Sequence, residues 1–252
     1  MTESDRAIYV YGIVPADVET EPDARGVGDP PGEVTTVKHG DIAALVSAVP
    51  TNIALGRPEE LAAHAALLDG AAAAAPVLPM KFGAVLDTED HVVDELLAAH
   101  HDEFAAALDE LEGKAEYVIK GRYQEDAILN EVLAENQEFR SLREAIRDKP
   151  ADATRNERIS LGEGINNAIA AKREADTRVV LAALTDLGLT VAEREATHER
   201  DAVHVVCLAE TAKQSELEDV LGRLADEWDE RVDLRLLGPL AAYDFVVSRT
   251  PE

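Results

Sequence analysis

The residues that most often carry out chemistry in proteins are present in this chain, but their spacing does not build a reactive site. Seven histidines are scattered along it, and the neighbours His100 and His101 would lie roughly 100° apart around a helix, so they cannot both face one metal ion. A single cysteine, Cys207, lies in the apolar run AVHVVCLA. It predicts a buried structural thiol and excludes an intrachain disulfide. We expect no metal and no cofactor.

Carboxylates are abundant, but no pair of them is singled out as a general acid and base. The acids between residues 87 and 110 follow the exposed side of a predicted helix. The glycine-rich stretch GVGDPPG, residues 26–32, leads through two prolines into a predicted strand, whereas a phosphate-binding loop leads into a helix N-terminus. The motifs of nucleophilic hydrolases and of P-loop proteins are absent. We therefore expect a protein that is not an enzyme, with a carboxylate-based hydrolase as an open alternative.

The charge of the chain narrows the choice of partners. With 51 acidic and 24 basic residues among 252, the formal net charge is −27, which repels nucleic acid and anionic membrane surfaces. The acids are spread along the whole chain, and arginine outnumbers lysine, as in proteins adapted to molar salt. We therefore expect stability to fall at low salt. No segment resembles an export signal or a membrane span, so we expect a cytoplasmic protein.

Three short segments combine apolar or aromatic residues with a glycine or a proline at the end of a predicted strand. They are YVYGIV (9–14), VLPMKFG (77–83) and GPLAAYDFVV (238–247). Taken singly, each indicates core residues beside a turn. Together they use most of the few aromatic residues, which also suits a rigid surface that docks another protein. The candidate docking residues are Tyr9, Tyr11, Gly12, Pro79, Met80, Lys81, Phe82, Gly83, Gly238, Pro239, Tyr243 and Phe245.

The middle segment has the most specific predicted roles. Pro79 fixes the backbone, and Gly83 permits a tight turn or a close approach. Met80 and Phe82 supply apolar contact area. Lys81 either pairs with a neighbouring acid of the same chain or contacts a partner, and the internal pair is favoured.

The first half of the chain predicts an α+β domain, residues 1–113, in the order β–β–β–α–β–α. Strands are expected at 6–15, twice within 34–49, and as a short central strand from Pro76 onward, with a surface loop at 16–33. One helix is expected at 57–74, with a buried stripe of Leu61, Ala65 and Leu68. A second helix is expected at 87–113, from a cap at Asp87 or Thr88 to a stop at Gly113.

The second half, residues 114–252, predicts a ferredoxin-like βαββαβ domain. Its strands are expected at 116–123, 189–197 and 202–210, with one or two more within 231–247, and a helix at 213–230. A helical insertion at about 125–187 consists of a segment broken near 136–138 and a long helix from 158 to 188. The middle of the long helix has few large apolar residues, which indicates either a projecting arm or a helix that is wet on most sides. The predicted fold class is therefore α+β with two domains, the first a modified ferredoxin-like unit.

In their order along the chain, the three segments resemble motifs of the gas vesicle protein GvpF/GvpL family. The stretch RISLGEGINNAIAAKREAD resembles the long-helix segment of the same family, and the resemblance covers nearly the whole chain. Where family members often carry a Pro-Pro pair before the last tyrosine, this chain has Ala241 and Ala242. Its length, acidity and long helix look more like the L-type protein of halophilic archaea than the F-type.

The resemblance implies a non-enzymatic accessory protein, located in the cytoplasm and on the gas vesicle, a hollow gas-filled shell that gives cells buoyancy. It implies a minor vesicle component that acts in nucleation and assembly of the shell. The implied partners are the shell protein GvpA and other accessory Gvp proteins. A ferredoxin-like regulatory module that binds a small ligand is the alternative.

Overall fold

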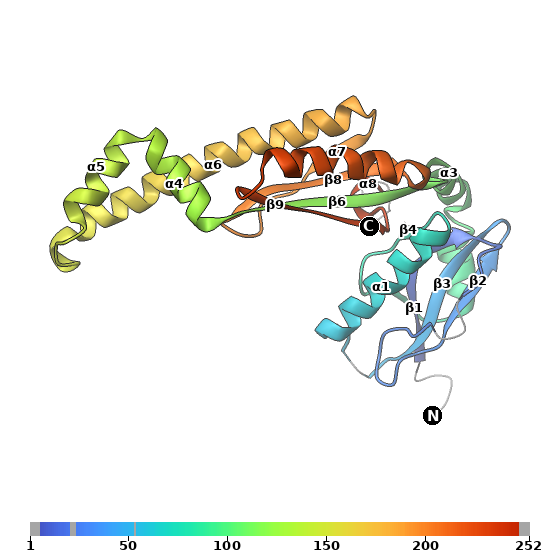
Figure 1. Cartoon of the computed structure of the whole chain (residues 1–252). Helices are drawn as coiled ribbons and strands as arrows, with labels where there is room; N and C mark the ends of the chain where they lie inside the picture. The colour runs from blue at the N-terminus through green and yellow to red at the C-terminus, as the bar shows by residue number, and fades with distance from the viewer. Residues whose placement is uncertain (1–5, 21–23, 53, 247–252) are drawn as a thin grey trace. The chain divides into compact units, whose positions relative to one another are not determined.

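Two antiparallel sheets organise the chain, and they are accompanied by helices in the computed structural model shown in Figure 1. The structure describes residues 6–20, 24–52 and 54–246, so residues 21–23 of the expected surface loop lie outside it. Contacts group the chain into two units, the first comprising residues 1–117, 208–213 and 238–252, and the second residues 118–207 and 214–237. The predicted α+β class is confirmed. The boundary at residues 113/114 stays a prediction, because contacts alone do not show which segment folds independently.

The sheet of the first unit has β1 (Arg6–Pro15) near its centre. The strand order is β2 (Val34–His39), β3 (Ile42–Pro50), β1, β4 (Leu78–Pro79), and β5 (Val85–Leu86) also pairs with β1. The predicted turn between β2 and β3 is confirmed by their antiparallel pairing, which closes at His39 and Ile42. The short strand that follows Pro76 lies at an edge of the sheet, so its prediction as a central strand is wrong. Pro79 explains the edge position, since it has no N–H to donate to a second neighbour.

A β-bulge in β1 decides which of its side chains share a face. The pairing with β3 shifts between Val10 and Gly12, so Tyr11 is an extra residue. Tyr9, Tyr11 and Val14 consequently pack in one core cluster, whereas Val10 and Ile13 pack in another. Because side chains alternate along a strand, only the extra residue allows Tyr11 and Val14 to share a face.

Each face of this sheet is covered by helical residues. The cluster that contains the tyrosines includes residues of α1 (Pro58–Ala74). The other cluster includes residues of the π-helical segment η2 (Val92–Leu97) and of α3 (His101–Leu111). The predicted cap Thr88 is confirmed, since its hydroxyl accepts the N–H of His91 at the start of α2 (Glu89–His91). The predicted single helix is interrupted, however, between α2 and α3.

The buried stripe of α1 differs from the prediction. Glu60, His64, Leu68 and Ala72 are buried, at the i,i+4 spacing of one helix face, whereas Leu61 is 48% exposed. In this alanine-rich sequence, helical periodicity is compatible with burial of the Leu61 face or of the Glu60 face. Hydrogen bonds favour burial of the Glu60 face: the Glu60 carboxylate accepts the N–H groups of Gly56 and Arg57, and His64 is bonded to the core residue Tyr9.

The sheet of the second unit has the strand order β7 (Thr190–Glu193), β8 (Asp201–Glu210), β6 (Lys114–Tyr123), β9 (Val232–Leu240). Numbered within βαββαβ, this order is 2-3-1-4, which is the ferredoxin-like arrangement that the sequence predicts. Figure 1 shows α7 (Gln214–Glu227) and part of α6 (Arg155–Asp186) along this sheet. Cys207 is buried in β8, as expected. A single strand closes the sheet, and the short helix α8 (Tyr243–Val246) follows it.

The helical insertion forms an arm within the second unit. The segments α4 (Glu125–Glu135) and α5 (Gln137–Ile146) both contact α6, and Asn136 marks the predicted break between them. Two single 3-10 turns, η3 (Asp152–Thr154) and η4 (Thr211–Lys213), precede α6 and α7. At 32 residues, α6 is about 48 Å long. Of the two interpretations of the long helix, a projecting arm or a helix that is wet on most sides, its contacts with α4 and α5 support the arm.

A network of charged side chains fastens this arm to the end of β6. Arg231 donates to Glu131 of α4 at 2.7 Å and to Asp176 of α6 at 2.9 Å. Asp176 also accepts the hydroxyl of Tyr123, and Lys172 donates to Glu131 at 2.6 Å. The network therefore ties two helices and a strand to one guanidinium group.

Candidate functional site

The three predicted motif segments meet within the first unit. The N–H of Met80 donates to the Tyr11 carbonyl at 2.8 Å, and the N–H of Val10 donates to the Ala84 carbonyl at 2.9 Å. The N–H of Gly83 donates to the hydroxyl of Tyr9 at 3.1 Å. The chain from Met80 to Ala84 is therefore held against β1 at both of its ends and in its middle.

Four aromatic rings pack beneath this turn. The ring centroids of Tyr9 and Phe82 are 5.8 Å apart, and those of His64 and Phe82 are 5.5 Å apart. Tyr11 lies 4.8 Å from Tyr9 and 5.6 Å from His64. These separations are typical of packed aromatic pairs, so the rings form a stiff base for the turn.

The tyrosine hydroxyls and His64 Nδ1 are bonded inside this cluster, whereas His64 Nε2 is buried without a hydrogen-bond partner among the described residues. The Tyr9 hydroxyl and His64 Nδ1 are 2.9 Å apart, and the Tyr11 hydroxyl and the Ser47 hydroxyl are 2.7 Å apart. The N–H of Val27 donates to the Tyr11 hydroxyl. Burial raises the pKa of Tyr9 to about 12 and lowers the pKa of His64. Both side chains are therefore neutral at pH 7, which suits a buried structural cluster.

The C-terminal segment joins the same unit through two carboxylates. Asp69 of α1 accepts the N–H of Ala241 at 3.1 Å, and Glu116 accepts the N–H of Asp244 at 2.9 Å. Tyr243 packs against the cluster that contains the tyrosines, and Phe245 against the other. The pKa of Tyr243 is raised by burial and by the nearby Asp69 carboxylate.

The predicted docking residues divide into those in strands and helix α8 and those in the turn of residues 80–83. In the first set Tyr9, Tyr11, Gly12 and Pro79 are buried, whereas Pro239, Tyr243 and Phe245 are half-buried. Gly238 is exposed and lies within β9 with a φ of +144°. In the turn of residues 80–83, Met80 and Phe82 are half-buried, and Lys81 and Gly83 are exposed.

Two glycines at this site have clear structural reasons. A Cβ on Gly12 would lie 2.7 Å from the carbonyl oxygen of Leu78, so only glycine lets β4 approach β1 this closely. Gly83 has a φ of +94°, which closes the turn that Lys81 begins. The predicted reason for Gly83, a tight turn, is confirmed.

The favoured internal ion pair of Lys81 is wrong. Among the residues that the structure describes, Lys81 forms no ion pair and no hydrogen bond, although the chain has 51 acidic residues. The physical reason is exposure: Lys81 is exposed to solvent, where an ion pair would contribute little to stability.

Sequence reasoning missed the side chains that support the turn from below. Each of four such side chains bonds to a residue of a motif segment, and they are His64, Ser47, Asp69 and Glu116. A signal was present for His64, since Glu60, His64 and Leu68 recur every four residues on a predicted helix. No sequence signal identifies Ser47, because its partner Tyr11 depends on the bulge.

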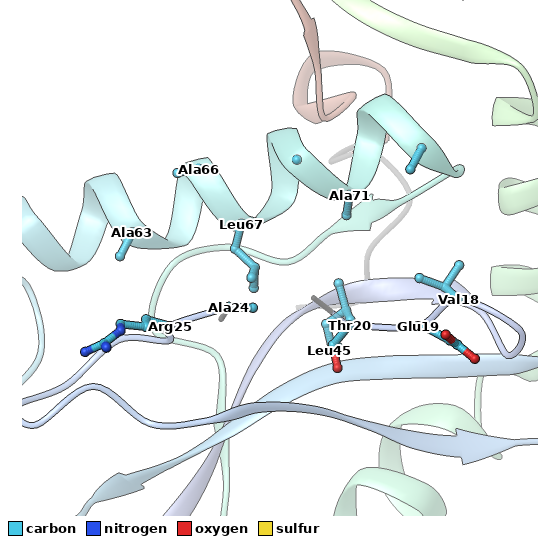
Figure 2. Close-up of a pocket in the computed structure, with 12 residues that line it drawn as sticks. Val18, Glu19, Thr20, Ala24, Arg25, Leu45, Ala63, Ala66, Leu67 and Ala71 are labelled. Atoms are coloured by element: carbon cyan, nitrogen blue, oxygen red, sulfur yellow. The ribbon is translucent and has the colours of Figure 1, made fainter. Parts of the chain in front are cut away.

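A hollow of about 330 Å³ lies beside α1 in the same unit. Figure 2 shows Leu67 and small side chains of the helix on one side, and the segments around Val18 and Arg25 on the other. Its lining is largely apolar, and Arg25 forms no ion pair with any described residue. Its volume is at the lower end of the range for small-molecule sites.

Two further classes of site are absent among the described residues. No three His, Cys, Asp or Glu side chains there come together as ligands for a metal ion. None of the helices in this part of the chain is long and apolar enough to span a bilayer.

Comparison with known proteins gives concordant findings. A family model described as gas vesicle synthesis protein GvpL/GvpF matches residues 7–247. Gas vesicle protein F of Streptomyces sp. (strain CB03234) is 31% identical over 248 residues, covering 94% of this chain and 98% of that relative. Gas vesicle protein L of the same strain is 31% identical over 130 residues, covering 46% and 48%.

Solved structures share the fold. The crystal structure of GvpF from Anabaena sp. PCC7120 matches with a TM-score of 0.76 at 22% identity, and covers 95% of this chain and 98% of that one. The crystal structure of GvpF from Microcystis aeruginosa matches with a TM-score of 0.72 at 18% identity and the same coverage.

Proposed function

Because the chain belongs to the gas vesicle GvpL/GvpF family, we propose that it is a non-enzymatic accessory protein that helps to nucleate and assemble the gas vesicle shell. The family supports a role connected with gas vesicles. The proposed partners are the shell protein GvpA and other accessory Gvp proteins, and the proposed location is the cytoplasm and the vesicle. The assignment to the L-type stays a prediction.

The observation that carries this proposal is the exposed turn of residues 80–83 on its buried aromatic base. Three backbone hydrogen bonds and the ring of Phe82 hold the turn in one shape. A preformed surface loses little conformational entropy on binding, so a small area can contribute useful affinity. Met80 and Phe82 offer apolar area, and Lys81 offers a cation without a partner in the described chain.

A shell subunit is a suitable occupant for such a surface. Subunits that polymerise into a shell expose apolar area and sheet edges before they assemble, and such surfaces aggregate. A highly acidic protein with a small rigid docking turn can bind such a subunit and keep it dispersed, since its own net charge of −27 opposes association.

The test is complex formation between the full-length protein and GvpA from the same host, co-expressed and purified in molar salt. The informative variant is Lys81→Glu, because Lys81 is exposed and its replacement leaves the core intact. The matched control is Lys38→Glu, an equally charged change at an exposed lysine of β2 in the same unit. We expect the Lys81 variant to weaken the complex by about tenfold, the effect of one charge contact.

The control should bind as the native protein does. Absence of any complex with the native protein would contradict the proposed contact with GvpA. Equal binding by the Lys81 variant and the control would show that the turn of residues 80–83 is not the docking surface.

The hollow beside α1 favours a second candidate, a regulatory module that binds a small apolar ligand. Its largely apolar lining and Arg25, which forms no ion pair with a described residue, suit an amphipathic carboxylate whose charged end lies away from Glu19 in the same lining. Calorimetric titration with medium-chain fatty acids tests this function. Saturable binding that disappears in Arg25→Gln would support it, and absence of heat would reject it for that ligand class.

A further inference from the structure

The tip of the helical arm is basic in an otherwise strongly acidic chain. Residues 139–158 contain six basic and four acidic residues, whereas the remaining 232 residues contain 18 basic and 47 acidic ones. The basic residues all lie in exposed positions, and they are Arg140, Arg143, Arg147, Lys149, Arg155 and Arg158. The sign of the local charge is therefore opposite to that of the whole molecule.

Three of these cations line a hollow between α5 and α6. It has a volume of about 460 Å³, and Arg143, Arg147 and Arg158 contribute to its lining. The rest of the lining is uncharged and comes from Ile146, Leu161, Gly162 and Ile165. Guanidinium groups thus lie beside aliphatic side chains in one concave surface, which we call the arm-tip hollow.

The cations of the arm-tip hollow lack acidic partners in the described part of the chain. Arg143 and Arg147 form no ion pair there, even though acids outnumber bases about two to one over the sequence. Arg158 bonds only to uncharged oxygens, namely the Thr154 hydroxyl at 3.0 Å and the carbonyls of Ile146 and Lys149. These bonds fix Arg158 in place and leave its charge uncompensated.

The walls of the arm-tip hollow are held close together. A Cβ on Gly164 of α6 would lie 2.7 Å from the ring of Phe139 on α5, so this glycine lets the two helices approach. Ile146 and Leu161 are buried between them. The hollow is therefore a preformed feature of the helix pair, which favours binding.

We propose that the arm-tip hollow binds an acidic amphipathic segment of another protein, with its carboxylates on the arginines and an aliphatic side chain on the uncharged floor. The charge complementarity is direct, and arginine pairs with carboxylates in a fixed fork geometry. Ile146, Leu161 and Ile165 give the hollow a floor that phosphate groups would not use. This is a second surface, in a different unit from the turn of residues 80–83, and it does not depend on the function proposed above.

Other occupants fit the hollow less well. Nucleic acid would meet the field of a molecule with 51 acids, and the hollow has no aromatic side chain in its lining on which a base could stack. A second copy of this chain would bring two net charges of −27 together. A short acidic segment avoids most of that repulsion.

The test measures binding of a labelled synthetic helical peptide, with glutamates on one face and leucines on the other, by fluorescence anisotropy. The full-length protein is compared with Arg143→Glu/Arg147→Glu and with the matched control Lys120→Glu/Arg223→Glu. All four positions are exposed in the second unit and none forms an ion pair among the described residues, so both variants change charge equally. Circular dichroism confirms that each variant is folded.

We expect saturable binding that the arm variant weakens by at least about tenfold and the control leaves unchanged. Peptides with glutamine for glutamate, or serine for leucine, should each bind more weakly. No binding by the native protein, or equal binding by the arm variant, would overturn the proposal. Polyphosphate that competes more strongly than the peptide, with no contribution from the leucines, would identify a general polyanion site and overturn it as well.

Discussion

His64 shows how a single residue of the first unit combines burial, hydrogen bonding and charge. It lies beneath the turn of residues 80–83, bonded to the Tyr9 hydroxyl, and burial lowers its pKa. Protonation of His64 would place a cation among aromatic rings and apolar side chains. Among the described residues, His64 forms no ion pair with a carboxylate. The fold beneath the docking turn therefore favours the neutral imidazole.

A pH prediction follows for His64. The unfolded chain takes up a proton at His64 below about pH 6.5, whereas the folded chain does so only at lower pH. The unfolded state then binds more protons, so the free energy of unfolding must fall as pH decreases below about 6.5.

The measurement is chemical denaturation at several pH values for the native protein and for His64→Phe, which cannot titrate. The many carboxylates contribute to both curves, so the difference in slope between them isolates His64. Identical slopes between pH 7 and pH 5 would show that His64 is not held neutral in the fold.

Phe82 supplies a second prediction at the residue scale. Its ring is half-buried against Tyr9 and His64, so Phe82→Ala should lower the free energy of unfolding by about 1–3 kcal/mol, less than for a fully buried ring. If the fold survives, binding to the partner should weaken too. Met80→Ser in the same turn is the control for lost apolar area without loss of ring packing. Unchanged stability and undiminished binding in Phe82→Ala would contradict both roles.

At the residue scale, the sequence predicts local backbone geometry better than it predicts which side chains are exposed. The turn at Gly83 follows from local backbone chemistry, and the structure confirms it. The burial of Val14 on the same face as Tyr9 and Tyr11 depends on a bulge in β1, and the exposure of Lys81 depends on how the turn of residues 80–83 packs against β1. Neither depends on local sequence, because each is set by pairing between distant segments.

Among the elements, the helical arm depends on a charged network more than on apolar packing. Asp176 and Glu131 have side-chain exposures of 11% and 28%, and both meet Arg231. Hydrogen bonds from Arg231 and Lys172 lower the pKa of Glu131, although burial alone would raise it. The guanidinium group of Arg231 is therefore the central contact that holds α4 and α6 to the end of β6.

Replacement of that guanidinium group tests its role. Arg231→Met should lower the free energy of unfolding by about 2–4 kcal/mol, because it leaves the mostly buried Asp176 carboxylate without its cation and leaves Glu131 with Lys172 alone. The control is Arg235→Met, whose partner Asp233 lies on the exposed sheet and whose loss should change stability by less than about 1 kcal/mol. Equal effects of the two changes in a thermal or denaturant titration would contradict the role of the network.

The elements themselves could largely be predicted, whereas their orientation could not. The break at Asn136, the start of α1 at Pro58 and the ferredoxin-like strand order all follow from caps, breakers and periodicity. The stripe of α1 was predicted wrongly because alanines supply no hydrophobic contrast, and Leu61 is exposed. The edge position of β4 could have been recognised from Pro79.

For the whole molecule, the net charge of −27 is the dominant property. The Debye length is about 3 Å at 1 M salt and about 30 Å at 0.01 M, so molar salt largely removes the repulsion among the acidic side chains. We predict that transfer from molar to millimolar salt lowers the free energy of unfolding by at least about 2 kcal/mol, or roughly 4–8 °C in Tm. Sucrose in place of salt is the control, since it carries no charge. Full stability in salt-free buffer would contradict this adaptation to salt.

The distribution of charge bears on the two binding surfaces proposed for the two units. A small docking turn lies in the first unit and a basic hollow in the second, while the rest of the chain is acidic. Such a distribution confines binding of other proteins to a few places and opposes association elsewhere. This suits an accessory protein that must bind assembly partners without joining the shell indiscriminately.

The central claim is that this protein is needed to build the gas vesicle shell, and one measurement tests it most directly. Gas vesicles are counted by electron microscopy in the native host after removal of the gene for this chain, and again after the full-length protein is restored. The account predicts that vesicles are lost or severely reduced and that the restored protein brings them back. Vesicles of normal number and size in cells that lack the protein would contradict it.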